Sequence, residues 1–199
     1  MSHPVFLLHG LGSHAWTLWP LMATLKSYGY AHCHCIEYPV DKLDFEGMLD
    51  YVDAEMQKYA SKNESVILIG QSMGGLVSNN MHTRGWNVRF AIYIGSPLHG
   101  ARLLTQLEGV LPTWVRNALF KKPYGILMSK DRESHPPHPY HTFSMGWFWT
   151  CFDGCVYRDE ATLDERHHTH LAWADHRTVF ANPRLWHAVV SKLDDALAA

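Results

Sequence analysis

Short apolar runs alternate along the chain with segments of helical periodicity. The runs at 4–8, 66–69 and 90–94 are almost wholly apolar, which is typical of strands buried on both faces. In the segments between them, apolar residues recur three and four positions apart, as on the buried side of a helix. Strands are expected at 4–8, 31–38, 66–69, 90–94, 142–152 and 167–173. Helices are expected at 13–28 and 41–59, after residue 72, and from 183 to 197.

This order of elements predicts the fold class. Strands and helices alternate up to residue 84, which indicates an α/β protein with a mostly parallel sheet and helices on both faces. The sheet should contain about six strands, and 199 residues fit a single domain, 1–199. The segment 103–139 is interrupted by proline and glycine. It is either a small cap or a crossover helix, and we favour the crossover because parallel strands require one.

The motif Gly70-Gln-Ser-Met-Gly74 lies directly between the run at 66–69 and a stretch with helical spacing. Glycines at a sharp strand-to-helix turn remove side chains, so the residue at the corner can adopt a strained backbone conformation. Ser72 stands at that corner, where a base and a substrate can reach its hydroxyl. We therefore interpret Ser72 as a candidate nucleophile. The alternative is a glycine-rich turn with a solvated serine.

A serine nucleophile needs a base, and the base needs an orienting acid. Asp153 precedes Gly154 at the end of an expected strand, which suits such an acid, although an ordinary Asp-Gly turn has the same sequence. His176 lies in the loop between the expected last strand and the terminal helix, where it can serve as the base. His170 and His187 are better interpreted as residues of a sheet face and of a helix surface.

Five motifs, taken in chain order, resemble those of the α/β-hydrolase fold lipases and esterases. They are His9-Gly-Leu-Gly, Gly70-Gln-Ser-Met-Gly, Gly95-Ser-Pro-Leu-His-Gly, Asp153-Gly-Cys-Val and His176-Arg-Thr-Val-Phe-Ala-Asn-Pro. The resemblance extends over about the whole chain and is closest to the small bacterial lipases with a minimal, nearly lidless fold. The chain order Ser, Asp, His is the one that this fold uses. The two N-terminal strands of larger members are not found before His9.

The resemblance implies an α/β-hydrolase fold with a triad of Ser72, Asp153 and His176. It further implies that the backbone N–H groups of Leu11 and Met73 form the oxyanion hole. The implied reaction is hydrolysis of a carboxylic ester through an acyl-enzyme, and it needs no cofactor.

Other residues around the expected site have weaker signals. Trp16, Leu98 and Trp114 are candidates for an apolar acyl pocket, although residues of these types are more often plain core or surface residues. His9 is interpreted as a partner that orders its loop, because the triad histidine comes last in this fold. Gln71 stands where many relatives have histidine, and we expect this difference to leave the chemistry unchanged.

Composition narrows the class of partner. The 17 basic and 19 acidic residues leave a net charge of −2 without long runs of one sign, so nucleic acid and anionic membrane surfaces are not expected partners. No apolar run is long enough for an integral membrane segment. The 4 cysteines are interpreted as reduced thiols of a cytoplasmic protein, with a Cys151 to Cys155 bridge as the alternative. The 15 histidines complete no recognisable ligand set, so no metal is expected.

Several functions remain open from the sequence. The preferred substrate is a small-molecule or lipid ester, and the preferred state is a monomer or small homo-oligomer. The same machinery can act as a thioesterase, an amidase or a hydrolase of lipid-linked esters, which motifs do not separate. A non-catalytic binding module is a further alternative, although such a module would usually have lost one of Ser72, Asp153 and His176. A histidine-rich metal-binding protein is the remaining alternative.

Overall fold

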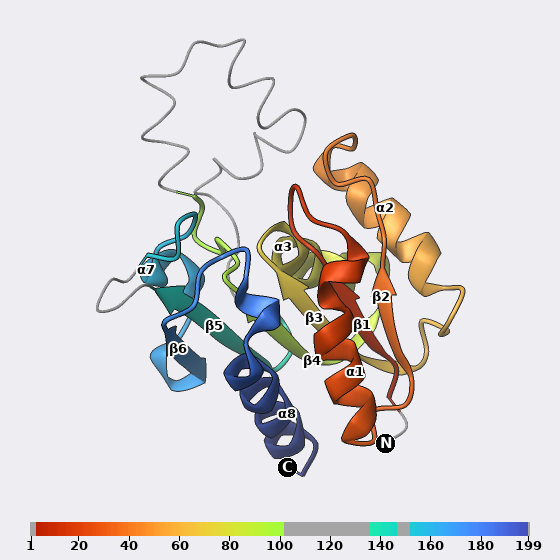
Figure 1. Ribbon diagram of the computed structural model, residues 1–199. Helices are drawn as coiled ribbons and strands as arrows, with labels where there is room; N and C mark the ends of the chain where they lie inside the picture. Colours follow the sequence, from red (N-terminus) through yellow and green to blue (C-terminus); the bar gives the residue numbers. More distant parts are fainter. Residues whose placement is uncertain (1–2, 102–135, 147–151, 199) are drawn as a thin grey trace, which may run out of the picture.

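One six-stranded sheet forms the centre of the computed structural model, which describes residues 3–101, 136–146 and 152–198 (Figure 1). The strands are β1 (Val5–Leu8), β2 (Cys33–Ile36), β3 (Ser65–Gln71), β4 (Asn87–Ile94), β5 (Tyr140–Gly146) and β6 (His168–Ala172). They lie in the order β2-β1-β3-β4-β5-β6, and every neighbouring pair is parallel. The predicted α/β class with a parallel sheet is confirmed.

Helices cover both faces of this sheet (Figure 1). The α-helices of the described residues are α1 (Trp19–Ser27), α2 (Phe45–Met56), α3 (Met73–Asn80), α7 (Arg158–Ala161) and α8 (Pro183–Ala198). The 3₁₀ helices there are η1 (Ala15–Leu18), η2 (Met81–Arg84), η3 (Glu165–His167) and η4 (Val179–Ala181). Helices α1 and α8 pack on one face, and α2 and α3 pack on the other.

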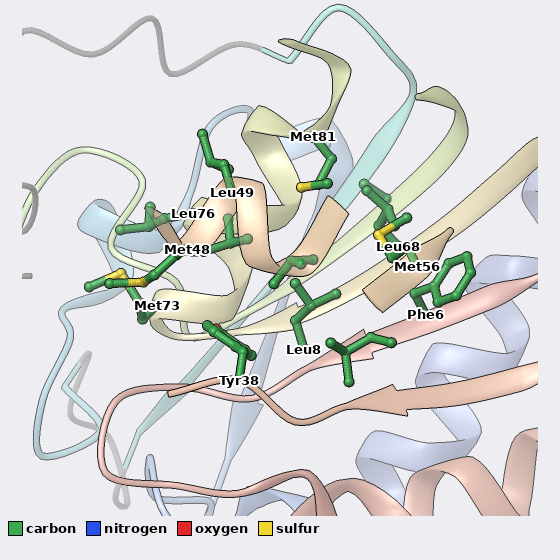
Figure 2. Packing of buried hydrophobic residues seen from close by; sticks show 14 of the residues in the cluster. Phe6, Leu8, Tyr38, Met48, Leu49, Met56, Leu68, Met73, Leu76 and Met81 are labelled. Atoms are coloured by element: carbon green, nitrogen blue, oxygen red, sulfur yellow. The ribbon is translucent and has the colours of Figure 1, made fainter. Parts of the chain in front are cut away.

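The central strands are continuously apolar because each one contributes to two cores. Val5 and Leu7 of β1 belong to the hydrophobic cluster under α1 and α8. Phe6 and Leu8 point the opposite way, into the cluster under α2 and α3 (Figure 2). Successive side chains of a strand alternate between faces, so a strand that is covered on both sides buries apolar side chains in both directions.

Some boundaries differ from the sequence prediction. The segment expected as one helix at 13–28 divides into η1 and α1, and Pro20 lies in the first turn of α1. A proline is tolerated there because the first helical N–H groups have no partner within the helix. Strand β5 starts at Tyr140, since the Pro139 carbonyl already accepts from Ala91 N at 3.0 Å. The described part of β5 extends to Gly146, and residues 147–151 of the expected strand lie outside the described residues.

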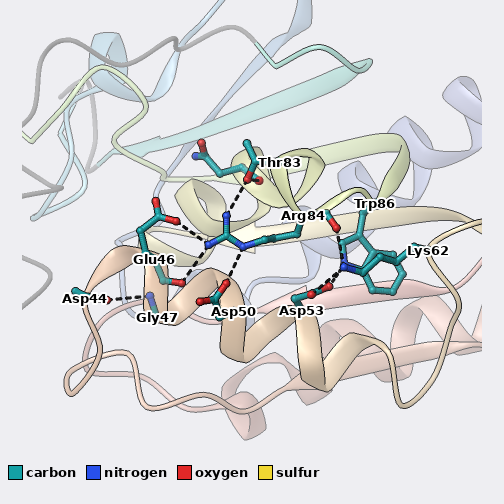
Figure 3. Close-up of polar contacts among 10 residues, drawn as sticks. Asp44, Glu46, Gly47, Asp50, Asp53, Lys62, Thr83, Arg84 and Trp86 are labelled. Atoms are coloured by element: carbon teal, nitrogen blue, oxygen red, sulfur yellow. Dashed lines mark hydrogen bonds and ion pairs between the residues drawn. The ribbon is translucent and has the colours of Figure 1, made fainter.

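A polar network fastens α2 to the chain that follows α3 (Figure 3). Arg84 contacts two carboxylates of α2, Glu46 at 2.6 Å and Asp50 at 2.8 Å. Nearby, the buried Trp86 donates its indole N–H to Asp53 Oδ1 at 2.7 Å. These contacts hold α2 against the amino end of β4, whereas Ser72 lies at the carboxyl edge of the sheet.

Candidate active site

The candidate nucleophile occupies the corner between β3 and α3. Ser72 follows the last residue of β3 and precedes Met73, the first residue of α3. Its backbone has φ 52° and ψ −120°, and Trp173 is the other non-glycine residue with positive φ among the described residues. Because such a conformation is strained, it persists only where the surroundings impose it. Here Ser72 N donates to the Ile94 carbonyl at 2.9 Å, which anchors the corner to β4.

Close packing explains the glycines around this corner. A Cβ built on Gly70 would overlap the carbonyl of Gly74, and one built on Gly74 would overlap the carbonyl of Leu8. A side chain at either position would therefore push α3 away from β1 and β3. The motif predicted from the sequence as a sharp turn has this shape because helix and strands touch through their backbones.

The loop after β1 lies against Ser72. A Cβ on Gly10 would come within 2.8 Å of Ser72 Cβ, so the two residues face each other. The Gly10 carbonyl accepts from Ser13 N at 3.2 Å and lies 3.0 Å from His9 Nδ1. In a trans peptide the N–H points opposite to the carbonyl, so these contacts orient the N–H of Leu11. Met73 N, the other predicted oxyanion donor, stands at the start of α3.

His9 is buried beneath this loop and orders it. Its Nδ1 must carry the proton, because the Gly10 carbonyl can only accept. Its carbonyl accepts from the Tyr38 hydroxyl at 2.6 Å. Burial lowers the pKa of the His9 imidazole, which keeps the ring neutral. This arrangement agrees with the role expected for His9 as a loop partner.

Asp153 and His176 form a buried pair. Asp153 Oδ2 lies 2.7 Å from His176 Nδ1, and the two residues are 2% and 8% exposed. The other carboxylate oxygen accepts from the backbone N–H groups of Cys155 at 2.9 Å and Val156 at 2.7 Å. His176 N also donates to the Asp153 carbonyl at 3.0 Å. Both carboxylate oxygens are thus hydrogen-bonded, and because Nδ1 of His176 bonds to Asp153, Nε2 is the ring nitrogen available to a reacting group.

Two contacts connect this pair to the nucleophile corner. The Gln71 side chain donates from Nε2 to the His176 carbonyl at 3.1 Å, which brings the histidine beside the residue that precedes Ser72. Gly95 lies under the pair with φ 54°, and a Cβ there would come within 3.2 Å of both Asp153 Oδ2 and His176 Nδ1. The loops after β1, β3 and β4 therefore meet Asp153 and His176 at the carboxyl edge of the sheet.

The other predicted residues are more scattered. Trp16 lies on η1 and is 59% exposed, whereas Leu98 is 1% exposed and belongs to the cluster under α2 and α3. Trp114 lies outside the described residues, as does the predicted cap or crossover segment at 103–139 up to residue 135. The pocket therefore stays a prediction. His170 lies on β6 and His187 on the exposed side of α8, apart from the site.

The side chains that could bind a metal ion and the thiols lie apart from one another or buried in the described part of the chain. No group of three or more His, Cys, Asp and Glu side chains is arranged there to hold a metal ion. Cys33, Cys35 and Cys155 are free thiols, and Cys151 lies outside the described residues. Burial raises the pKa of Cys33 and Cys35 to about 12, so these thiols are unreactive near neutral pH. No helix within the described ranges is long and apolar enough to cross a membrane.

Comparisons with known proteins agree with this architecture. Residues 5–198 match the model of the alpha/beta hydrolase family. The mature lipase BlEst2 of Bacillus licheniformis superposes with a TM-score of 0.74 at 18% identity, over 96% of this chain and 91% of that one. The N-acyl homoserine lactonase AidH superposes with a TM-score of 0.62 at 15% identity, over 97% and 89%.

A third similar structure is phospholipase PlaB from Legionella pneumophila, with a TM-score of 0.62 at 11% identity. The match covers 81% of this chain and 46% of that protein, so this chain spans less than half of the phospholipase. A search of the curated proteins finds no match. At these identities the structural likeness shows the fold.

Proposed function

Because the chain belongs to the alpha/beta hydrolase family, we propose that it is a serine hydrolase that cleaves carboxylic esters through an acyl-enzyme. The observation that carries the proposal is the buried hydrogen bond between Asp153 and His176. A carboxylate that is 2% exposed would be costly to keep without a partner, and here its partner is the imidazole of His176. The backbone carbonyl of His176 accepts from the side chain of Gln71, the residue directly before Ser72. This is the acid and base arrangement that activates a serine.

In the proposed reaction, the Ser72 hydroxyl attacks the ester carbonyl while His176 Nε2 takes its proton. Asp153 holds the Nδ1–H tautomer and stabilises the imidazolium that forms. The tetrahedral oxyanion accepts hydrogen bonds from the N–H groups of Leu11 and Met73, and one such donor can contribute about 3 kcal/mol. His176 then passes the proton to the leaving alcohol. Water hydrolyses the acyl-enzyme by the same steps, and no cofactor takes part.

The substrate class is proposed on chemical grounds. The similar structures include a lipase, a phospholipase and a lactonase, names that all denote cleavage of ester bonds. We propose a small-molecule or lipid ester as substrate, in a single-domain protein that is a monomer or small homo-oligomer of the cytoplasm. Thioester or amide hydrolysis is the alternative on the same machinery, and a non-catalytic binding module is the alternative without it.

The test compares wild type with Ser72→Ala on p-nitrophenyl esters of increasing acyl length. Alanine keeps the Cβ and so meets the same backbone strain as serine at φ 52°, which makes it a matched variant for the hydroxyl alone. We expect turnover in wild type and its loss in Ser72→Ala, at an unchanged thermal midpoint. A fluorophosphonate probe should label the wild type and leave the variant unlabelled.

The alternatives give different results in the same assay. If only thioesters or anilides of matched acyl groups are turned over, the machinery is correct and the substrate class is wrong. If wild type reacts with neither ester nor probe, the serine hydrolase assignment fails and the scaffold is a binding module. Equal activity in wild type and Ser72→Ala would place the chemistry elsewhere.

A further inference from the structure

The side chain of Gln71 makes contacts that the motif alone does not indicate. Gln71 is the last residue of β3, directly before Ser72, and it is 6% exposed. Its Oε1 accepts from Gly10 N at 3.0 Å, and its Nε2 donates to the His176 carbonyl at 3.1 Å. One amide therefore joins two loops that are 61 and 105 positions away along the chain.

The direction of this amide is determined by its partners. A backbone N–H can only donate and a backbone carbonyl can only accept, so the oxygen must face Gly10 and the nitrogen must face His176. No other orientation satisfies both contacts. Because the amide is buried, losing either contact would leave a polar group without a partner.

On one side, the amide of Gln71 holds the oxyanion loop. It binds the N–H end of Gly10, while His9 and Ser13 hold the carbonyl end. The Gly10 carbonyl belongs to the same peptide unit as the N–H of Leu11. With both ends of Gly10 held, the direction of the Leu11 N–H is determined before a substrate arrives, which is the condition for an effective oxyanion donor.

On the other side, Gln71 completes the support of the candidate base. The N–H of His176 donates to the Asp153 carbonyl, and its ring contacts the Asp153 carboxylate. The His176 carbonyl, which Asp153 does not reach, is held by Gln71. The backbone of the base is thus held from β3 as well as from the acid.

We propose that Gln71 is a positioning residue that keeps the oxyanion loop and the His176 loop aligned on Ser72 through a single side-chain amide. The proposal rests on the serine hydrolase function above and deepens it. The amide has no step of its own in the proposed reaction, and its contacts are with Gly10 N and the His176 carbonyl. A misplacement of about 1 Å at such a site can lower the rate by about 100-fold.

Two substitutions distinguish the hydrogen bond that Gln71 accepts from Gly10 from the one that it donates to His176. Gln71→Met has a similar length and loses both contacts. Gln71→Glu keeps an acceptor for Gly10 N and places a carboxylate oxygen against the His176 carbonyl, so only the donor is lost. Ile67→Val is the matched control, because Ile67 lies in the same strand, is fully buried and packs under α1 and α8. It lowers stability without contacting either loop.

In Gln71→Met we expect kcat on p-nitrophenyl butyrate to fall by about 100-fold while KM changes by less than about threefold. The affinity for phenylboronic acid, which forms a tetrahedral adduct with serine, should fall in parallel with kcat. Gln71→Glu should also lose kcat, because the His176 carbonyl would face a carboxylate. Ile67→Val should keep kcat within about twofold at a comparable loss of thermal midpoint.

Some results would overturn the proposal. One is a Gln71→Met protein whose kcat is near that of wild type. Another is an Ile67→Val protein that has the same thermal midpoint as Gln71→Met and loses as much kcat. If Gln71→Met does not fold, Gln71→Glu decides by the same comparison. The Gln71 variants test the bridge once wild type is seen to react with the fluorophosphonate probe and Ser72→Ala is seen not to react. If wild type itself fails to react, the proposed function is wrong, and the role of Gln71 falls with it.

Discussion

Asparagine at position 153 would separate the proposed catalytic role of the carboxylate from its structural role. The amide oxygen of Asp153→Asn can still accept from the N–H groups of Cys155 and Val156, which now bond to Oδ1. The amide nitrogen then faces His176 Nδ1, where the carboxylate now accepts at 2.7 Å. Because an NH₂ group can only donate, Nδ1 must become the acceptor and the proton must move to Nε2. An imidazole in that tautomer cannot take the proton of Ser72.

The expected loss follows from this reversal. With the geometry kept and the tautomer reversed, kcat should fall by about 10,000-fold. At about 1.36 kcal/mol per factor of ten, this corresponds to about 5.4 kcal/mol of transition-state stabilisation. The free energy of unfolding should fall by less than about 2 kcal/mol, since both backbone amides keep a partner. Asp153→Ala should lose similar activity and more stability, because the N–H groups of Cys155 and Val156 lose their acceptor, and the buried one, that of Val156, costs about 1–3 kcal/mol.

The assay combines kcat on p-nitrophenyl butyrate with urea unfolding for wild type and both variants. An Asp153→Asn protein that keeps its activity within about tenfold would refute the reasoning, because a reversed tautomer leaves no base for Ser72. Equal losses of stability in the two variants would show that the contacts to Cys155 and Val156 carry little free energy.

Three further results are expected. Gly75→Ala should lower the free energy of unfolding by about 1–3 kcal/mol in urea titration, because its Cβ would overlap the buried Ser96 Oγ; a loss near zero would contradict this packing. Arg84→Met should cost less than about 1 kcal/mol, and less still at high salt, because both of its carboxylate partners on α2 are largely exposed; a larger, salt-independent loss would count against it. Burial lowers the pKa of His141 from 6.5 to about 4, so the unfolded chain takes up the proton first and the wild type should lose stability as pH falls between these values. His141→Gln should make that dependence shallower in urea titrations at both ends of the range, and an unchanged slope would refute it.

The elements were predictable where local pattern is sufficient. The apolar run at 66–69 lies within β3, and the helix expected from 183 to 197 is α8, at whose start Asn182 Oδ1 accepts from Arg184 N at 3.0 Å. The boundaries that differ are those that neighbours decide. Strand β5 starts at Tyr140 because Tyr140 pairs with Ala91 of β4. The sequence around Tyr140, which follows a proline, does not indicate this pairing.

The candidate site divides in the same way. The glycines around Ser72 indicate the corner, since a tight turn requires small residues at adjacent positions. No sequence pattern indicates the bridge through Gln71, because Gly10 contributes its backbone N–H and His176 its backbone carbonyl, groups that nearly every residue has. The expectation that glutamine at this position leaves the chemistry unchanged stays a prediction.

The sequence by itself determined the order of strands and helices, the parallel sheet and the identity of the corner residue, because each depends on side chains close together in the chain. Tertiary structure decided which distant groups meet. Asp153 and His176, 23 positions apart, form a 2.7 Å contact only because β5 and β6 end at the edge where Ser72 turns into α3. Hydrogen bonds act over about 3 Å, so they depend on how the sheet brings its loops together and not on any pattern along the chain.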